Sequence, residues 1–248
     1  ALGPRGAWLL EPYADLPSST GLNTTPMDAA RETARLALQH NYQLAIHAIG
    51  DRANRELLNL YEEAFKGVPD TKALRWRDEH AQHLSLSDIG RFAELGVIPA
   101  MQGVHCTSDA PYVMARLGPT RAEEGAYVWQ KLMKTGAVIS NGTDAPVEDL
   151  SPIQNFHATV TRQDASGRPP GGFDPDQKLT RDEALRTMTL DAAYGSFAEK
   201  EKGSIEVGKL ADLVVLSQDI LSVPDDRLLQ TRVEMTILDG RVLYEGGR

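Results

Sequence analysis

Four side chains able to bind a metal or transfer a proton recur along this chain, each at or just after a short apolar stretch. They are His47 in QLAIHAIGD, His80 in RDEHAQH, His105 in VIPAMQGVH and Asp144 in AVISNGTDAP. His80 follows His47 after 33 residues, and Asp144 follows His105 after 39. One strand–helix unit of a (β/α)8 barrel takes about 31 residues, since roughly 250 residues form eight units. The spacing therefore predicts one such side chain for each strand–helix unit.

The chemistry of these side chains is that of a metal centre. Neutral imidazole nitrogens and carboxylate oxygens are ligands that Zn²⁺ prefers, and catalytic zinc sites leave one position for water. A water on such a metal has a pKa of about 7 and provides hydroxide at neutral pH. Two histidines and a carboxylate, His47, His80 and Asp144, are therefore predicted to bind a divalent metal. Taken singly, each histidine has the alternative of a hydrogen-bonded rim residue, and Asp144 that of a helix or turn cap.

Two neighbouring residues compete with this interpretation. His83 follows His80 by three positions, and residues three apart on a strand point to opposite faces. Position favours His80, which lies closer to the body of the strand. Cys106 beside His105 would be a thiol with a base, but adjacent side chains rarely face each other, so a thiol nucleophile is disfavoured.

Hydrophobic periodicity predicts the elements that must position these residues. Strands are predicted at residues 42–48, 73–81, 97–105 and 137–146, and the first of these is a short apolar run typical of a strand covered on both faces. Patterns with helical spacing lie at residues 24–40, 52–67, 87–95, 121–135, 152–163 and 181–195.

Local signals support several of these boundaries. Thr120 with Glu123, and Thr180 with Glu183, have the spacing of capping boxes at helix starts. From residue 203 the pattern becomes β-rich, and Asp239-Gly240 is a strong hairpin turn signal. Between residues 105 and 120 the pattern predicts a long connection without a defined element.

Strands that alternate with helices predict an α/β fold with a parallel sheet built from right-handed βαβ units. A doubly wound sheet and a TIM-type barrel are both compatible with this alternation. In both, the carboxyl ends of the strands carry the chemistry. No Gly-x-Gly-x-x-Gly or Walker A sequence follows any predicted strand, which argues against dinucleotide and P-loop sites.

The composition excludes other classes of protein. The chain has 248 residues, 41% hydrophobic and 25% charged, which is ordinary for a globular protein with a sizeable core. A net charge of −9 argues against nucleic acid and anionic membrane surfaces as partners. No apolar run approaches the ~18 residues of a membrane span. The single cysteine excludes internal disulfides, so the cytoplasm is the expected compartment.

The motifs around the four residues resemble the amidohydrolase superfamily, and in particular its amidohydrolase-3 branch, which includes N-substituted formamide deformylases. The resemblance runs in order along nearly the whole chain. The motifs that carry it are LAIHAIGDRA, RDEHAQ, MQGVHCTSD with RLGP, AYVWQKL, NGTDAPVEDLSPIQNFHATVTRQ, LTRDEALRTMT and KGSIEVGKLADLVVLSQD.

This resemblance implies a fold and a role for each residue. The family fold is a metal-binding (β/α)8 barrel with a β-sandwich built from both chain ends. His47 and His80 match the histidines that end the fifth and sixth strands, and Asp144 matches the eighth-strand aspartate that binds metal and shuttles a proton. His105 would stabilise developing oxyanion charge, and Arg5 would contact substrate. The resemblance implies one or two divalent metals, zinc foremost, and hydrolysis of an amide or formamide.

The chain also departs from the family pattern. It has no His-x-His pair, and no lysine precedes Lys66, although the family carries a His-x-His pair on its first strand and a bridging lysine further on. We therefore expect the C-terminal half of a TIM-type barrel at residues 1–196 and part of a β-sandwich at residues 197–248.

This departure leaves other functions and partners open. The chain alone would be a non-catalytic half-barrel that needs a complementing N-terminal half, or that pairs as a homodimer. The same fold also serves deaminases, esterases and lactonases, and fold alone does not decide among them. The expected partner in catalysis is a small amide-type substrate.

Overall fold

The structure, a computed structural model, describes residues 1–246 and divides the chain into two compact units. The first unit comprises Ala1–Met101 and His105–Ile139, and the second comprises Gln102–Val104 and the chain from Ser140 onward. The helices described in residues 1–246 are α1 (Met27–Gln39), α2 (Asp51–Ala64), α3 (Leu86–Leu95), α4 (Gly103–Leu117), α5 (Pro119–Gly125), α6 (Trp129–Lys134), α7 (Pro152–Thr161), α8 (Arg181–Met188) and α9 (Leu190–Gly195). The strands are β1 (Ala45–Ala48), β2 (Arg77–His80), β3 (Ile98–Gln102), β4 (Ser140–Gly142), β5 (Leu213–Leu216), β6 (Val233–Leu238) and β7 (Arg241–Glu245).

A parallel sheet carries the predicted strand ends. Its strand order is β1-β2-β3-β4, and β1 pairs with β2, and β2 with β3, in parallel. The register places His47 opposite Glu79. These pairings confirm the α/β class and the parallel sheet. The closed barrel, the β-sandwich and the boundary at residue 196 stay predictions.

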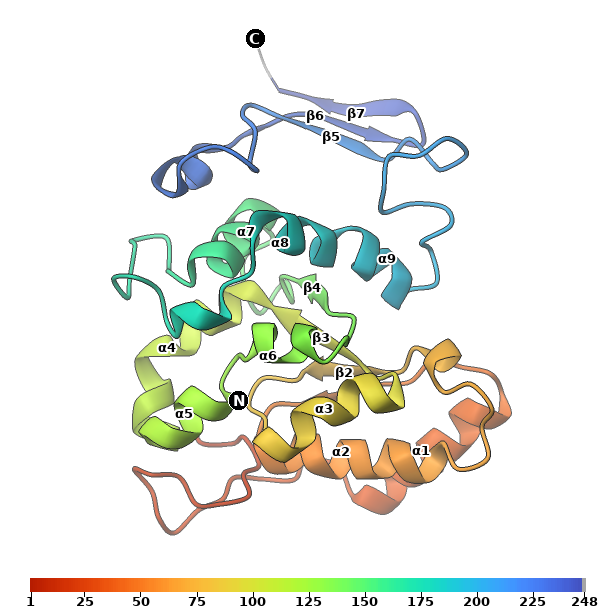
Figure 1. Ribbon diagram of the computed structural model, residues 1–248, viewed down its shortest axis with the longest axis vertical. Helices are drawn as coiled ribbons and strands as arrows, with labels where there is room; N and C mark the ends of the chain where they lie inside the picture. The colour runs from red at the N-terminus through yellow and green to blue at the C-terminus, as the bar shows by residue number, and fades with distance from the viewer. Residues whose placement is uncertain (247–248) are drawn as a thin grey trace. The chain divides into compact units, whose positions relative to one another are not determined.

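Helices cover this sheet through an apolar and aromatic core. In the first unit, α1, α2 and α3 follow one another beside β1 and β2 (Figure 1). Trp76 is fully buried directly before β2, and its ring lies 5.0 Å from that of Tyr61 and 5.1 Å from that of Phe65. All five residues of β3 are buried, as expected for a parallel strand covered on both faces.

The turn after β1 depends on a glycine because the N-terminal segment crosses it. A Cβ atom on Gly50 would lie 2.0 Å from the carbonyl oxygen of Trp8. The next residue, Asp51, accepts hydrogen bonds on Oδ1 from the backbone amides of Leu10 and Arg52, both at 2.9 Å. The end of β1 is thereby tied to the N-terminal segment.

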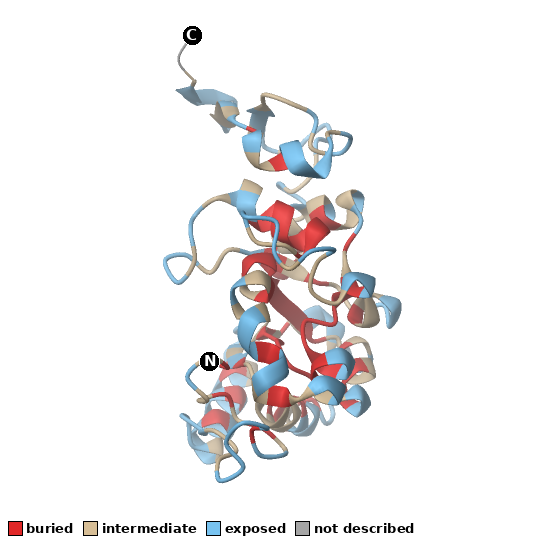
Figure 2. Ribbon diagram, turned by 90° about the vertical axis from the view of Figure 1, so that its left-hand side faces the viewer, coloured by how far each residue is buried: buried red, intermediate tan, exposed pale blue. Residues whose placement is uncertain are grey.

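The second unit contains an antiparallel sheet in the order β5-β6-β7. The Asp239-Gly240 turn joins β6 to β7, which confirms the hairpin prediction. The capping box at Thr180 and Glu183 is also confirmed, and it starts α8. Residues of β5–β7 are mostly intermediate or exposed, whereas the helices and strands of the first unit contain many buried residues (Figure 2).

The prediction for residues 105–135 was wrong in two respects. The expected connection contains α4, which begins directly after β3. The expected single helix at 121–135 is two, α5 and α6, and α5 begins at Pro119 after Gly118, so no capping box at Thr120 starts it. The break has a tertiary cause, because Tyr127 has a positive φ of 55° and its amide donates to the carbonyl oxygen of Gln82 at 2.8 Å.

The pattern at residues 181–195, expected as one helix, is likewise divided. Thr189, with φ −122° and ψ −86°, separates α8 from α9. These dihedrals lie outside the helical region, so the helical hydrogen bonding stops there.

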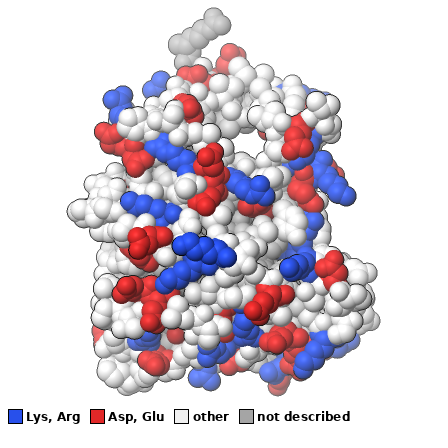
Figure 3. Space-filling view, in the orientation of Figure 1, with Lys and Arg blue, Asp and Glu red and all other residues white. Residues whose placement is uncertain are grey.

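The outer surface fits the composition. Basic and acidic side chains are interspersed on the face shown in Figure 3, without a large area of one sign. Each helix within residues 1–246 is too short or too polar to traverse a bilayer.

Candidate metal centre

Two of the predicted ligands face each other at the ends of neighbouring strands. Nε2 of His80 lies 2.9 Å from Nδ1 of His47, and the two rings meet edge to face, 4.7 Å apart at an interplanar angle of 65°. His47 is exposed on β1, whereas His80 is 6% exposed at the last position of β2. Parallel pairing of β1 with β2 brings both rings to the carboxyl edge of the sheet.

A third imidazole lies beside this pair. His105 is the third residue of α4, which begins where β3 ends, and its ring centroid lies 5.6 Å from that of His80. The first turn of α4 replaces the loop that the sequence pattern predicted at this position. The carboxyl ends of β1, β2 and β3 thus present three histidines in one cluster.

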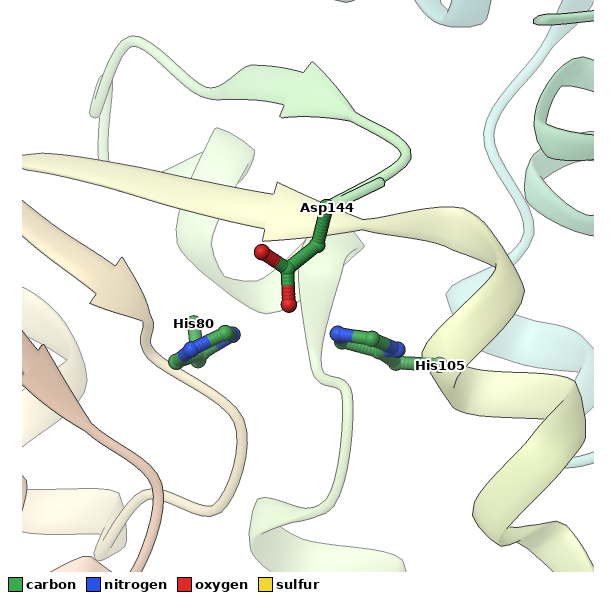
Figure 4. Close-up of side chains that lie close together, drawn as sticks. All are labelled: His80, His105 and Asp144. Carbon is green, nitrogen blue, oxygen red and sulfur yellow. The ribbon is translucent and has the colours of Figure 1, made fainter. Parts of the chain in front are cut away.

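Asp144, the fourth predicted residue, follows β4 with a positive φ of 58°. Figure 4 shows its carboxylate with the rings of His80 and His105. One candidate ligand atom from each of the three residues lies within 4.8 Å of the other two. His47 is outside this group of three but contacts His80 directly.

The geometry of these donors fits a divalent metal. Ligand nitrogens at about 2.0–2.1 Å from a tetrahedral zinc lie about 3.3 Å apart. The His47 and His80 nitrogens lie 2.9 Å apart, a hydrogen-bond distance that is a few tenths of an ångström shorter than this ligand spacing. Imidazole nitrogens together with one carboxylate are also the donor set of catalytic zinc sites. The roles of His47, His80, His105 and Asp144 stay predictions.

A largely buried polar cluster contains Gln82 and Asp109, which follow His80 and His105 by two and four residues. Nε2 of Gln82 donates to Oδ2 of Asp109 at 2.7 Å and also to the hydroxyl of Tyr127, which in turn donates to Oδ2 of Asp109 at 2.9 Å. Burial, reinforced by the Asp109 charge, raises the pKa of Tyr127 well above its usual range. The Tyr127 hydroxyl therefore keeps its proton and acts as a donor.

His83, the alternative to His80 as a predicted ligand, is buried against Tyr127. It is 2% exposed, its ring meets that of Tyr127 edge to face at 5.3 Å, and its two nitrogens have no hydrogen-bond partner among the described residues. Burial lowers the pKa of His83 to about 3, so the neutral ring packs in the core.

Asp78 is a second buried ionisable group close to the site. It is fully buried on β2, and this burial raises the pKa of its carboxyl well above its usual range. The backbone amide of Ala81 opposes the shift by hydrogen bonding, while the Glu79 charge adds to it. The protonated, neutral carboxyl is therefore favoured, which suits its place in the core.

Arg5, the predicted substrate contact, forms an ion pair with Asp15. Its Nε and Nη2 donate to the two oxygens of Asp15 at 3.1 and 3.0 Å. Arg116 also donates to Asp15 and to the carbonyl oxygen of Gly3. These contacts join the N-terminal segment to α4, and a substrate role for Arg5 stays a prediction.

Comparison with known proteins identifies the family. A model of the amidohydrolase family matches residues 1–244. The chain belongs to the amidohydrolase family. It is 31% identical over 245 residues to the putative amidohydrolase YtcJ of Bacillus subtilis, covering 99% of this chain and 45% of that protein. It is 30% identical over 226 residues to the N-substituted formamide deformylase of Arthrobacter pascens, covering 91% of this chain and 41% of that protein.

A solved structure supports the same assignment for this amidohydrolase-family chain. A metal-dependent hydrolase from Pyrococcus horikoshii superposes with a TM-score of 0.79 at 30% identity, covering 91% of this chain and 44% of that one. The chain thus spans less than half the length of these relatives.

Sequence reasoning did not find the cluster of Gln82, Asp109 and Tyr127. Gln82 and Asp109 are 27 residues apart, and Gln82 and Tyr127 are 45 apart. Gln82 and Asp109 lie within motifs that carry the family resemblance, RDEHAQ and MQGVHCTSD. No local pattern links these residues, so the one signal in the sequence would be that Gln82 and Asp109 follow two predicted site histidines by only a few residues.

Proposed function

We propose that the protein carrying this chain is a metal-dependent hydrolase of carbon–nitrogen bonds other than peptide bonds, and that its substrates are amides or formamides. The observation that carries this proposal is the convergence of the His47 and His80 nitrogens at 2.9 Å beside His105. The similarity to an N-substituted formamide deformylase supports formamides as the substrate class.

In this proposal His47, His80 and Asp144 hold one or two divalent metals, with zinc as the first candidate. Such a metal, when bound, lowers the pKa of water to about 7 and polarises a carbonyl oxygen. Nitrogen ligands from two strands and one carboxylate leave room in the coordination shell for substrate and water.

The proton transfers belong to the chain's own residues. The Asp144 carboxylate accepts a proton as the oxygen of water bonds to the carbonyl carbon. The same carboxyl group then delivers that proton to the nitrogen as the carbon–nitrogen bond breaks. The products are an amine and a carboxylic acid, which is formic acid for a formamide. His105 donates to the developing oxyanion.

The decisive experiment compares two carboxylates that are close in sequence. In the full-length protein carrying this chain, Asp144→Asn is expected to reduce kcat on N-substituted formamides by about 10²–10⁴-fold, as for loss of a general acid–base group. Asp149→Asn is the matched control, because Asp149 is exposed and its Oδ1 accepts from the Ser151 amide, a bond that asparagine retains. An Asp144→Asn protein with unchanged kcat would refute the mechanism.

The substrate panel decides the reaction class. Ammonia release from an aminated heterocycle, or acid release from an ester or lactone, with no turnover of amides or formamides, would replace the proposal by a deaminase or an esterase. Stoichiometric zinc and turnover by this chain alone would refute the alternative of a non-catalytic half-barrel.

A further inference from the structure

The backbone at His80 adopts a conformation that L-residues rarely use. His80 has φ 87° and the following Ala81 has φ 42°. Each residue held in such a region costs on the order of 1–3 kcal/mol and persists only where its surroundings over-determine it. The loop after β2 must therefore be held by contacts beyond its own sequence.

Backbone hydrogen bonds hold the residues that follow. The amide of Tyr127 donates to the carbonyl oxygen of Gln82 at 2.8 Å, and the amide of His83 donates to that of Ile49 at 2.9 Å. The Leu84 amide donates to a carbonyl oxygen in the same 125–127 segment, also at 2.9 Å. Residues 82–84 are thus fixed on two sides, immediately after the two residues with positive φ.

Three side chains connect this loop to α4. Gln82, Asp109 and Tyr127 form the mutually hydrogen-bonded cluster described above, and we name it the loop clamp. Gln82 is 5% exposed and Tyr127 is 1% exposed, so water competes little for the bond between them, whereas Asp109 and its two bonds are partly buried. A connected and largely buried polar network favours one arrangement, because an alternative leaves a polar group without its partner.

The clamp joins the two backbone segments that carry histidines. Gln82 follows His80 by two residues. Asp109 follows His105 by four residues on α4, which is about one helical turn, so the two side chains lie on the same face of the helix. A shift of α4 against the loop after β2 would therefore have to break a partly buried hydrogen bond to Asp109.

We propose that the loop clamp is a positioning device that holds the loop carrying the metal ligand His80 against α4 and His105, and thereby sets the affinity and geometry of the metal site. This inference rests on the proposed metal-dependent function. Gln82, Asp109 and Tyr127 act through the two histidines and are positioning residues.

The test is Co²⁺ binding by the full-length protein, followed by the visible absorption of the bound ion. Loss of groups that orient metal ligands typically weakens affinity by 10–100-fold. Asp109→Leu is expected to weaken Co²⁺ binding by about 10–100-fold and to alter the Co²⁺ spectrum. Tyr127→Phe, which removes one donor, is expected to weaken binding about tenfold. Asp109→Asn keeps an oxygen that can accept from both Gln82 and Tyr127, so its Co²⁺ affinity and spectrum are expected to stay close to those of wild type.

Tyr13→Phe is the matched control for loss of a buried tyrosine hydroxyl. Tyr13 is 1% exposed, and its hydroxyl donates to the carbonyl oxygen of Ala7 at 2.7 Å. This variant is expected to lower the unfolding midpoint and to leave the Co²⁺ spectrum unchanged.

The outcomes separate the two proposals. A Tyr127→Phe protein with wild-type Co²⁺ affinity and spectrum overturns the loop clamp, and so does an equal effect of Tyr13→Phe. If Asp109→Leu does not fold, comparison of the Co²⁺ affinity and spectrum of Tyr127→Phe with those of Asp109→Asn decides the role of the loop clamp. Wild-type protein that binds no Co²⁺ or Zn²⁺ refutes the metal-dependent function itself.

Discussion

The parallel strands β2 and β3 and the antiparallel strands β5–β7 bury their side chains very differently. Every residue of β3 is buried, whereas every residue of β7 is exposed. A helix follows each parallel strand, although Ala45 and His47 on β1 are exposed, while β6 and β7 pair through a local hairpin. The difference teaches that covered parallel strands can bring distant side chains to one edge, whereas a hairpin brings together residues that are already neighbours in sequence.

The predicted chemistry follows this division. His47 and His80 lie on the parallel strands and His105 follows β3, while β5–β7 contain no histidine or cysteine. A covered sheet restricts the position of each strand end, which a metal site needs because its ligands must converge within a few tenths of an ångström.

The largest effect that sharpens this comparison is loss of a strand-end ligand. His80→Ala is expected to weaken Zn²⁺ binding by more than about 100-fold, because a ligand itself is removed, beyond the 10–100-fold typical of outer-shell changes. Isothermal titration of the full-length protein with Zn²⁺ measures the affinity. His40→Ala, which changes an exposed histidine after α1, is the control and is expected to bind as wild type. Equal Zn²⁺ affinities of wild type, His80→Ala and His40→Ala would contradict the proposed metal site.

Next in size is loss of the aromatic residue directly before β2. Trp76→Ala is expected to reduce the free energy of unfolding by about 3–5 kcal/mol, because it leaves a cavity beside Tyr61 and Phe65. Chemical denaturation followed by circular dichroism gives the value. A loss below about 1 kcal/mol would mean that the core relaxes around the cavity.

The third prediction uses the buried His83. Its pKa in the folded state is about 3, below the 6.5 of a free histidine, so the unfolded state takes up the proton first as pH falls. The stability that this neutral ring contributes is therefore complete above pH 6.5 and is lost progressively down to pH 3. Between pH 7 and pH 5 the loss is about 2 kcal/mol, at 1.36 kcal/mol per pKa unit.

Urea unfolding of wild type and His83→Phe at pH 7, 6 and 5 isolates this contribution. Phenylalanine keeps a ring against Tyr127 but does not titrate. The difference in stability between the two proteins is expected to shift in favour of the variant as pH falls. A constant difference would show that His83 is protonated or solvated in the folded protein.

The smallest effect compares one substitution in the two regions. Val97→Thr, directly before β3, is expected to cost about 1–3 kcal/mol because Val97 is 1% exposed and the new hydroxyl would be buried. Val242→Thr on β7 is expected to change stability by no more than about 0.5 kcal/mol, since that side chain is 54% exposed. Thermal unfolding of both variants measures the contrast, and equal losses would show that β7 is covered in solution.

The local sequence determined the features that depend on neighbouring residues. Apolar runs predicted the strands that end near His47 and His80, the Thr180 capping box predicted the start of α8, and Asp239-Gly240 predicted the last hairpin. The side-chain types at successive strand ends also predicted which residues could form a site. Each of these signals acts within a few residues, so the sequence alone carries it.

Only the tertiary structure decided the rest. Pairing of residues 125–127 with the loop after β2 divided the helix expected at 121–135, and it accompanies the positive φ of His80. β2 ends at His80, where this positive φ leaves the strand conformation. The cluster joins Gln82 to Asp109, which is 27 residues away in sequence, and to Tyr127, which is 45 residues away. Long-range hydrogen bonds in a buried core override local propensity, and no window of the sequence contains both partners.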